Sequence, residues 1–301
     1  MGLFFNYTKE GPGVDKNAPK KKGIFLYFEI LFRKIWKLCQ ANFLYVVCSL
    51  PMILIYYLLV TPFIFNFVQI LGQGEAAISS EDVSMYSTML TLFITVTSVV
   101  FMGSGPASAS FAYITRCFSR EEHAWILTDF FAKFKENFKQ GMIVAVIDII
   151  AMVMGGFAIR FYYNYYLNNG QTIWFFLMCV LTICMFLFIS MHYYIYQLMV
   201  TFENKIKDLY RNALILAMST FPVNLLFTLL FGAISFVIFT VFTPIMSVIL
   251  TLVILVGLLR FPFEFYAESV IRKKILINID NNSSDNEIEE KEDENMIGVD
   301  N

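Results

Sequence analysis

The sequence predicts an all-α membrane protein with about six transmembrane helices. Of its residues, 58% are hydrophobic and only 15% are charged, whereas about a quarter of the residues in a soluble domain are charged. Several long segments are almost free of charge and are long enough to cross a bilayer, which takes about 20 residues. The net charge of -2 argues against a nucleic-acid binder, which would carry a basic excess.

The first expected span runs from Phe43 to Leu71, and the second covers Met85–Tyr113. The second contains the run Gly103-Ser104-Gly105-Pro106. Two glycines and a proline can unwind a helix, and many transporters hold substrates at broken helices. The same residues equally suit tight helix packing at a kink. Gly103, Gly105 and Pro106 are therefore candidate positions for function or for packing.

The third and fourth expected spans are Met142–Tyr163 and Ile173–Val200. The segment Ala213–Leu259 carries no charged residue, and as a single helix it would be roughly 70 Å long, more than twice the thickness of the hydrocarbon core. It must therefore fold back once. We expect the turn at Thr243-Pro244, because proline breaks the helical hydrogen bonds and disfavours helix at the preceding residue. This gives the fifth and sixth spans.

The distribution of basic residues tests this count. All but one of the 22 Lys and Arg residues lie on one side of the six-span arrangement, and the exception is Arg160. The positive-inside rule assigns that side to the cytoplasm. The sequence therefore predicts a multi-pass protein whose N and C termini are both cytoplasmic.

An amphipathic stretch precedes each pair of spans on the predicted inner side. The apolar positions of these stretches recur every three or four residues: Ile24, Phe28, Leu31, Ile35 and Leu38; Leu127, Phe131, Phe134 and Phe138; and Ile206, Leu209, Tyr210 and Ala213. Such helices lie in the headgroup plane of a membrane. We expect three hairpins, each preceded by an inner-surface helix. Either a duplicated unit or shared membrane constraints would produce this repetition.

The ends of the chain differ in composition from the middle. Residues 1–22 are expected to form a flexible basic segment, and residues 23–277 the six-span transmembrane domain. Residues 278–301 are acidic and rich in Asn, which is typical of a disordered tail.

The sequence predicts no catalytic, cofactor-binding or metal site. It contains no phosphate-binding loop, no dinucleotide-binding glycine motif and no nucleophile elbow. His123 and His192 are the only histidines, and neither shows ligand spacing with an acid or a thiol. The five cysteines include no Cys-x-x-Cys pair. We therefore expect a protein that is not an enzyme and that uses no cofactor.

Asp148 is an acid well inside the third span. A carboxylate at such a depth costs about 2.5–3.5 kcal/mol on insertion scales, so it should face the bundle or a water-filled cavity. Ala151 and Gly155 share its helical face and would let another helix approach closely. Asp148 is either a proton or substrate contact, or a structural contact to a Ser, a Thr or a backbone group of a neighbouring helix.

Charged residues also gather at the predicted inner ends of the spans. We expect most of them to be solvated or to snorkel, and a docking surface for a cytoplasmic partner is the alternative. The set comprises Arg116, Arg120, Glu121, Glu122, Glu203, Arg260, Glu264 and Glu268.

One stretch resembles the YesL-like family of bacterial membrane proteins, in which a Gly-Pro-Ala span end precedes a basic-acidic turn and an aromatic helix. The resemblance rests on Gly105-Pro106-Ala107, Arg116, Glu121-Glu122, Asp129-Phe130-Phe131, Phe134-Lys135, Asn137-Phe138 and Gln140. Weaker likeness extends over roughly residues 25–275. The biochemical function of that family is unknown, and its members are often encoded beside carbohydrate uptake systems of the ATP-driven binding-cassette type. The resemblance implies a bacterial plasma membrane and supplies no catalytic residues.

Two hypotheses of function follow. The first is a non-enzymatic accessory protein of a transport system for carbohydrates, with the lipid bilayer and a binding-cassette transporter complex as partners. The second is an autonomous secondary transporter that uses the broken second span and Asp148. An intramembrane enzyme would need an acid pair, or a nucleophile and its base, at matching depth, and the sequence shows neither.

Overall fold

The computed structural model describes residues 23–71 and 80–276. The predicted flexible segment 1–22 and the predicted tail 278–301 lie outside the described residues, as does most of the loop between the first two spans. Within the described part, the chain is all α-helical, and six helices are long and apolar enough to cross a membrane. The predicted fold class is therefore confirmed.

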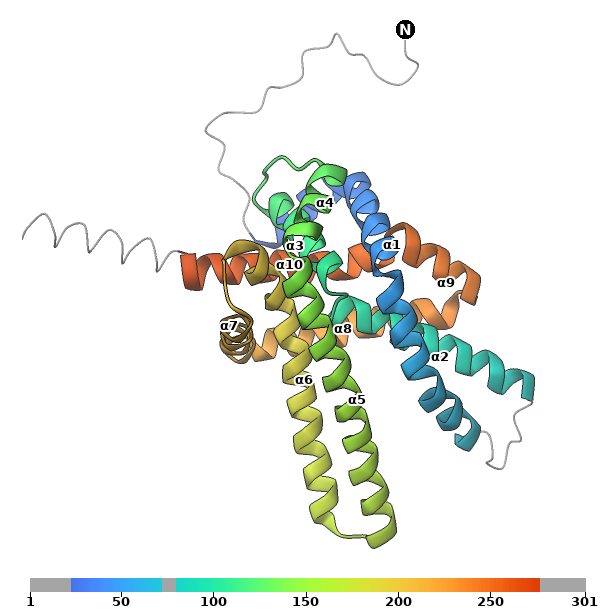
Figure 1. Ribbon diagram of the computed structural model, residues 1–301. Coiled ribbons are helices and arrows are strands. Elements are labelled where there is room, and N and C mark those ends of the chain that lie inside the picture. Colours follow the sequence, from blue (N-terminus) through green and yellow to red (C-terminus); the bar gives the residue numbers. More distant parts are fainter. Residues whose placement is uncertain (1–22, 72–79, 277–301) are drawn as a thin grey trace, which may run out of the picture.

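The spans pair into three hairpins (Figure 1). The first consists of α1 (Ile24–Leu71) and α2 (Ser80–Phe101), and the second of α5 (Phe138–Asn169) and α6 (Thr172–Thr201). The third joins α8 (Phe221–Val241) to a rod made of α9 (Pro244–Leu250), the π-helix η1 (Thr251–Leu255), α10 (Val256–Ile271) and the π-helix η2 (Arg272–Leu276).

The turns of the second and third hairpins follow from local chemistry. Gly170 ends α5 in the left-handed conformation, at φ 64°, which glycine adopts without steric cost. The third hairpin turns at Thr243-Pro244, as predicted. There Pro244 occupies the first helical position of α9, and the Thr243 hydroxyl accepts a bond from the Met246 N–H at 3.4 Å.

Three shorter helices connect the hairpins at the end of the spans where most Lys and Arg residues lie, which we call the basic end. They are α3 (Pro106–Ser119), α4 (Ile126–Glu136) and α7 (Ile206–Ser219). Helix α3 contacts α1, α4, α5, α6 and α10, and 11 of its 14 residues are buried. The small side chains of its first turns, Ala107, Ser108 and Ala109, permit this close approach on all sides.

The packed core also lies at the basic end. Helix α6 is buried continuously over residues 190–199, and α5 is buried mainly between Gly141 and Asp148. From this core, the far ends of the hairpin α5–α6 and of the hairpin α1–α2 extend away (Figure 1). Many of the exposed side chains there are large and apolar, including Phe157, Phe161 and Phe176, as expected of surfaces that face lipid.

Two boundaries differ from those predicted. The first amphipathic stretch does not form a separate helix, because α1 continues without a break from Ile24 into the span. The second span ends at Phe101, and residues 106–113 belong to the separate helix α3. This second difference follows from the run Gly103–Pro106, whose glycines and proline interrupt the helix locally.

The apolar residues of α4 lie on two faces of the helix. Ile126 and Phe130 are buried, whereas Leu127 and Phe131 are exposed. The Trp125 N–H donates to the Asp129 carboxylate at 2.8 Å, which fixes the first turn and hence the rotation of the helix.

The π-helix η1 has a specific partner on α1. The Asn42 amide donates to the carbonyls of Thr251 and Leu252 at 3.1 and 2.8 Å, and its oxygen accepts from the Gly257 N–H at 2.7 Å. A π-helical turn shifts the normal helical hydrogen bonds and so frees backbone groups to bond elsewhere. A single buried side chain thus satisfies this irregular segment and ties the first span to the last.

Candidate functional site

The helical structure is interrupted between α2 and α3, at the predicted run Gly103-Ser104-Gly105-Pro106, and we call this interruption the break. Gly103 and Gly105 have φ of 90° and 69°, a region that other residues rarely adopt. The freed Ser104 N–H donates to the Ser108 hydroxyl at 2.7 Å, and the Gly105 N–H donates to the Tyr196 hydroxyl at 3.3 Å. Buried hydroxyl groups therefore accept from both of these backbone N–H groups.

Glycines also set the distance between α3 and its neighbours. A Cβ atom on Gly141 would lie 2.6 Å from the Pro106 nitrogen, and one on Gly105 would lie 2.8 Å from the Gly141 carbonyl oxygen. These distances are far below van der Waals contact, which is about 3.5–4.0 Å between carbon atoms. Helix α5 thus packs against the backbone of the break itself.

Asp148 faces His192 across the interface between α5 and α6. Its Oδ1 lies 2.7 Å from His192 Nε2 and 3.5 Å from the hydroxyl of Tyr210, and its carboxylate is buried. The other ring nitrogen, His192 Nδ1, lies 2.9 Å from the Phe188 carbonyl. Both ring nitrogens therefore lie within hydrogen-bond distance of an oxygen atom.

Tyr210 lies on α7, outside the spans. Burial and the nearby Asp148 carboxylate raise the pKa of Tyr210 well above its usual value. The Tyr210 hydroxyl therefore keeps its proton and acts as a donor toward Asp148.

Arg260 of α10 lies at the centre of a second buried group. Its guanidinium pairs with Glu264 Oε1 at 2.9 Å and donates to Tyr45 Oη at 2.8 Å and to Ser108 Oγ at 2.9 Å. The other oxygen of Glu264 accepts from Gln197 at 2.7 Å. Arg260 also donates to the Val99 carbonyl of α2, and Gln197 of α6 also donates to the Ala112 carbonyl of α3. The ion pair on α10 is therefore contacted by four other helices, α1, α2, α3 and α6.

Tyr196 joins the two groups. The guanidinium of Arg260 lies 5.4 Å from its ring centre, and its ring centre lies 6.3 Å from that of His192. We call the whole set the buried polar core: Tyr45, Ser104, Ser108, Asp148, His192, Tyr196, Gln197, Arg260 and Glu264. Each of these residues is buried, so the core is closed to solvent in this conformation.

The remaining predicted residues lie apart from this core. Arg116 donates to the Val200 carbonyl at 2.7 Å and to Thr201 at 3.0 Å, which caps the end of α6. Asn137 separates α4 from α5 and donates to the Lys133 carbonyl. Glu203 is exposed in the turn between α6 and α7. Of the candidates, the structure brings together only Asp148 and the run Gly103–Pro106.

The expectation of solvated charges at the inner rim is wrong for three residues. Arg260, Glu264 and Glu268 are each only 3% exposed. Arg260 and Glu264 pair with each other in the core, and Glu268 accepts from Arg120 at 2.6 Å. Helices α1, α3 and α6 cover this part of α10. The buried charges are therefore stabilised by ion pairs instead of by solvation.

Sequence reasoning missed His192, Tyr196, Gln197, Arg260 and Glu264 as core residues. One signal was available, because Arg260 and Glu264 are four residues apart on one helix and can pair. His192 could have been flagged as an ionisable residue within an apolar span. Its pairing with Asp148 joins two helices at a separation of 44 residues, and the sequence carries no signal for that contact.

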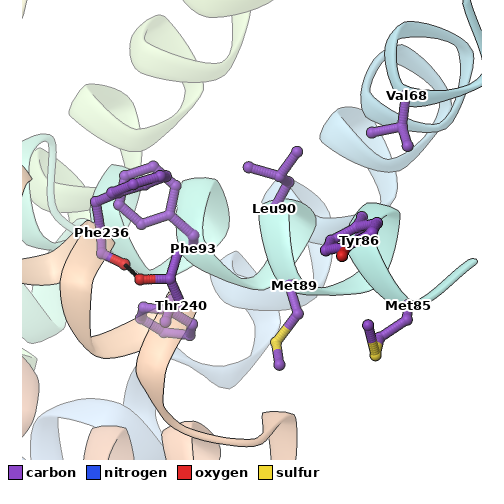
Figure 2. A pocket seen from close by; sticks show the side chains of 9 residues that line it. Val68, Met85, Tyr86, Met89, Leu90, Phe93, Phe236 and Thr240 are labelled. Carbon is purple, nitrogen blue, oxygen red and sulfur yellow. Dashed lines mark hydrogen bonds between the residues drawn. The ribbon is translucent and has the colours of Figure 1, made fainter. Parts of the chain in front are cut away.

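An apolar pocket of about 370 Å³ lies elsewhere, between α1, α2 and α8. Figure 2 shows that Phe93, Phe236 and Thr240 line one part of it, and Met85 and Tyr86 another. Among the residues that the structure describes, those that line it carry no charge, and such a lining suits a hydrocarbon chain. Among the described residues, no three His, Cys, Asp or Glu side chains are grouped as metal ligands would be.

Fold and site together define a multi-pass, all-α membrane protein with a closed, charged core at the basic end of its spans. A family described as a protein family of unknown function, DUF624, matches residues 84–165. That stretch covers α3, α4 and most of α5, and it includes Gly103–Pro106 and Asp148. Neither the curated proteins nor the solved structures contain a match to the chain.

Proposed function

We propose that the chain is a non-enzymatic protein of a bacterial plasma membrane that acts as an accessory to a carbohydrate uptake system of the binding-cassette type. The YesL-like resemblance supports the setting and the class of partner, and its residues lie within the stretch matched by the family of unknown function. In this proposal the basic end of the spans is cytoplasmic, as the positive-inside rule predicts.

An aromatic face at the start of α1 carries the proposal. Phe25, Phe32 and Trp36 are each 71–74% exposed, and their spacing places them on one side of the helix together with Phe28. The opposite side of the same helix, which includes Ile30, is buried against the core. Large aromatic side chains are enriched where proteins bind one another, because they bury much area at little entropic cost.

The charged residues of this helix are used within the chain. Arg33 pairs with Glu121, and Lys34 lies 4.7 Å from the ring centre of Phe118. These contacts fix the helix against the turn that precedes α4, where Trp125 is also strongly exposed. The aromatic face is therefore held rigidly, so a partner would meet it with little loss of conformational freedom.

The closed state of the core also favours a supporting role. The polar groups of the core bond mainly to one another, and helices cover them on every side that the structure describes. Such an arrangement fixes the relative positions of five helices. A scaffold needs this rigidity, whereas a transporter must open a path to its binding site.

The test is a pull-down of the tagged chain from its own host in a mild detergent, with partners identified by mass spectrometry. We expect stoichiometric recovery of a permease or ATPase subunit of a carbohydrate transporter. The variant F32S/W36S should lose that partner, whereas I173S/F176S should keep it, because Ile173 and Phe176 are comparably exposed but lie at the opposite end of the spans. Recovery of the chain alone would contradict the proposal.

One observation favours a second function, autonomous secondary transport. The break at Gly103–Pro106 adjoins the buried pair of Asp148 and His192 through Tyr196, and transporters combine such features in proton-coupled uptake. The purified chain in lipid vesicles should then accumulate a sugar when a pH gradient is imposed, and D148N should abolish accumulation. Vesicles that stay empty for every sugar tested would exclude this second function for those sugars.

A further inference from the structure

Arg160 on α5 is the one Lys or Arg residue that the predicted arrangement places at the end of the spans opposite the basic end, which we call the far end. It lies 21 residues after Lys139, and a helix of that length rises about 32 Å, close to the thickness of the hydrocarbon core. Between these two residues, the only charged side chain of α5 is the buried Asp148. Lys139 and Arg160 therefore mark the two headgroup layers.

Aromatic residues just beyond Arg160 agree with this depth. The ring centre of Trp174 on α6 lies 6.1 Å from that of Tyr162 and 4.9 Å from that of Tyr165 on α5. Trp and Tyr gather at membrane interfaces, because their rings are largely apolar and carry one polar group. Arg160 thus lies where acyl chains meet headgroups, and a side chain at that level extends its charge toward the phosphates.

A recess of about 590 Å³ adjoins Arg160 on the surface of α5. Met154, Phe157 and Phe161 form its apolar part, and Arg160 and Asn164, one helical turn apart, contribute polar groups. Among the residues that the structure describes, its lining includes no carboxylate. A guanidinium and an amide therefore border the same space as large apolar side chains.

The recess lies beside the point where the first two hairpins meet. The ring centre of Phe63 on α1 lies 5.6 Å from that of Phe157 and 5.9 Å from the guanidinium carbon of Arg160. Beyond this contact the two hairpins diverge (Figure 1). Arg160 takes part in none of the ion pairs within the described part of the chain. In a bilayer, lipid fills the space between diverging spans, because a void would forfeit the contacts of the side chains that line it.

We propose that this recess binds the phosphate of an anionic phospholipid in the leaflet at the far end. Arg160 and Asn164 donate to the phosphate oxygens, and an acyl chain lies against Phe157 and Met154. The planar guanidinium matches the geometry of phosphate oxygens, to which it donates two parallel hydrogen bonds. The apolar part of the recess favours a lipid over a free phosphate ion, which would gain nothing from Phe157. The binding does not depend on the accessory function.

The chain offers a reporter for this test, because Trp174 is the only tryptophan at the far end, whereas Trp36 and Trp125 lie at the basic end. The ring of Tyr162, which Trp174 contacts, also lines the recess. The full chain with the changes W36F/W125F is placed in vesicles of phosphatidylcholine. Phosphatidylglycerol with brominated acyl chains is then added in increasing proportion, and brominated phosphatidylcholine serves for comparison. Bromine quenches the fluorescence of a neighbouring tryptophan.

We expect phosphatidylglycerol to quench Trp174 at about a fivefold lower mole fraction than phosphatidylcholine does, the factor that one basic side chain near a membrane surface contributes. R160Q in the same background should abolish this preference while the protein stays monodisperse, because Arg160 is exposed. The control R160Q/N168R returns the charge to α5 two turns beyond the recess, and it should not restore the preference.

Four outcomes would overturn the proposal. A preference that persists in R160Q would place the lipid elsewhere, and one that returns in R160Q/N168R would mean that surface charge alone attracts it. Loss of the preference on adding millimolar inorganic phosphate or glycerol phosphate would show that Arg160 binds a soluble anion. The variant E75Q removes the one carboxylate of residues 72–79, which join α1 to α2. A preference that appears only in E75Q would mean that this carboxylate neutralises Arg160 instead of a lipid.

Discussion

The contact between Gly141 and the break before α3 allows a sharp test, because α5 supplies its own control. Gly141 and Gly156 are both helical residues of α5. A Cβ atom on Gly141 would lie 2.6 Å from the Pro106 nitrogen, whereas one on Gly156 would meet nothing within 4 Å. Changing each glycine to alanine therefore separates steric cost from helix propensity.

The expected magnitudes follow from these distances. Alanine gains about 1 kcal/mol over glycine in a helix, and this gain applies to both positions. At Gly141, the new methyl group must displace the backbone of α3 by about 1 Å to reach ordinary contact. Overpacking of this kind costs about 1–3 kcal/mol. G141A should therefore be less stable than G156A by about 1–3 kcal/mol, since the shared gain cancels.

The assay is thermal unfolding in a mild detergent, followed by the loss of the monodisperse peak in size-exclusion chromatography. G156A should melt at or above the temperature of the unchanged chain, and G141A at least about 2 °C below G156A. Equal melting temperatures of the two variants would refute the close packing of α5 on the break. It would also weaken the assignment of Gly103–Pro106 to the core.

Five further variants probe three of the buried polar groups. N42A removes the side chain that satisfies the π-helix η1 and should cost about 1–3 kcal/mol, seen as a lower melting temperature; an unchanged temperature would mean that η1 needs no partner. R260M leaves the Glu264 carboxylate buried without its cation and should cost about 3–5 kcal/mol, whereas R260M/E264Q should recover much of the loss in yield of monodisperse protein. H192A should destabilise the chain by a similar amount, because it leaves Asp148 without its partner on α6. D148N should cost no more than about 1 kcal/mol, because the amide can still bond to the imidazole ring. A larger loss of stability in D148N than in H192A would contradict the pairing.

The span pattern could be predicted because it depends on local composition. Length, absence of charge and the asymmetry of Lys and Arg fixed six spans, and Pro244 marked the last turn. The break at Gly103–Pro106 was also visible, because glycine and proline act on their own backbone. These features need no knowledge of neighbouring helices.

The depth and the partners of charged residues could not be predicted in the same way. Arg260 stands at the end of an apolar run, where a snorkelling side chain is the usual case. Only the packing of α1, α3 and α6 around it turns that position into an interior one. The face of α4 that packs on the core was not predictable either, since aromatic residues occupy two of its faces and Phe130 is buried whereas Phe131 is exposed. Sequence periodicity cannot choose between two apolar faces.

The position of Arg260 along the chain has a consequence for biosynthesis. Its partners Tyr45 and Ser108 lie on α1 and α3, which are synthesised before α10, where Arg260 lies. Before α10 is synthesised, the hydroxyl groups of Tyr45 and Ser108 lack the Arg260 guanidinium that donates to them. Helix α3 then also lacks its contact with α10. The core therefore cannot close before α10 has been synthesised. A chain that stalls before α10 would present an open polar surface to the proteases that survey membranes, and a finished chain would not.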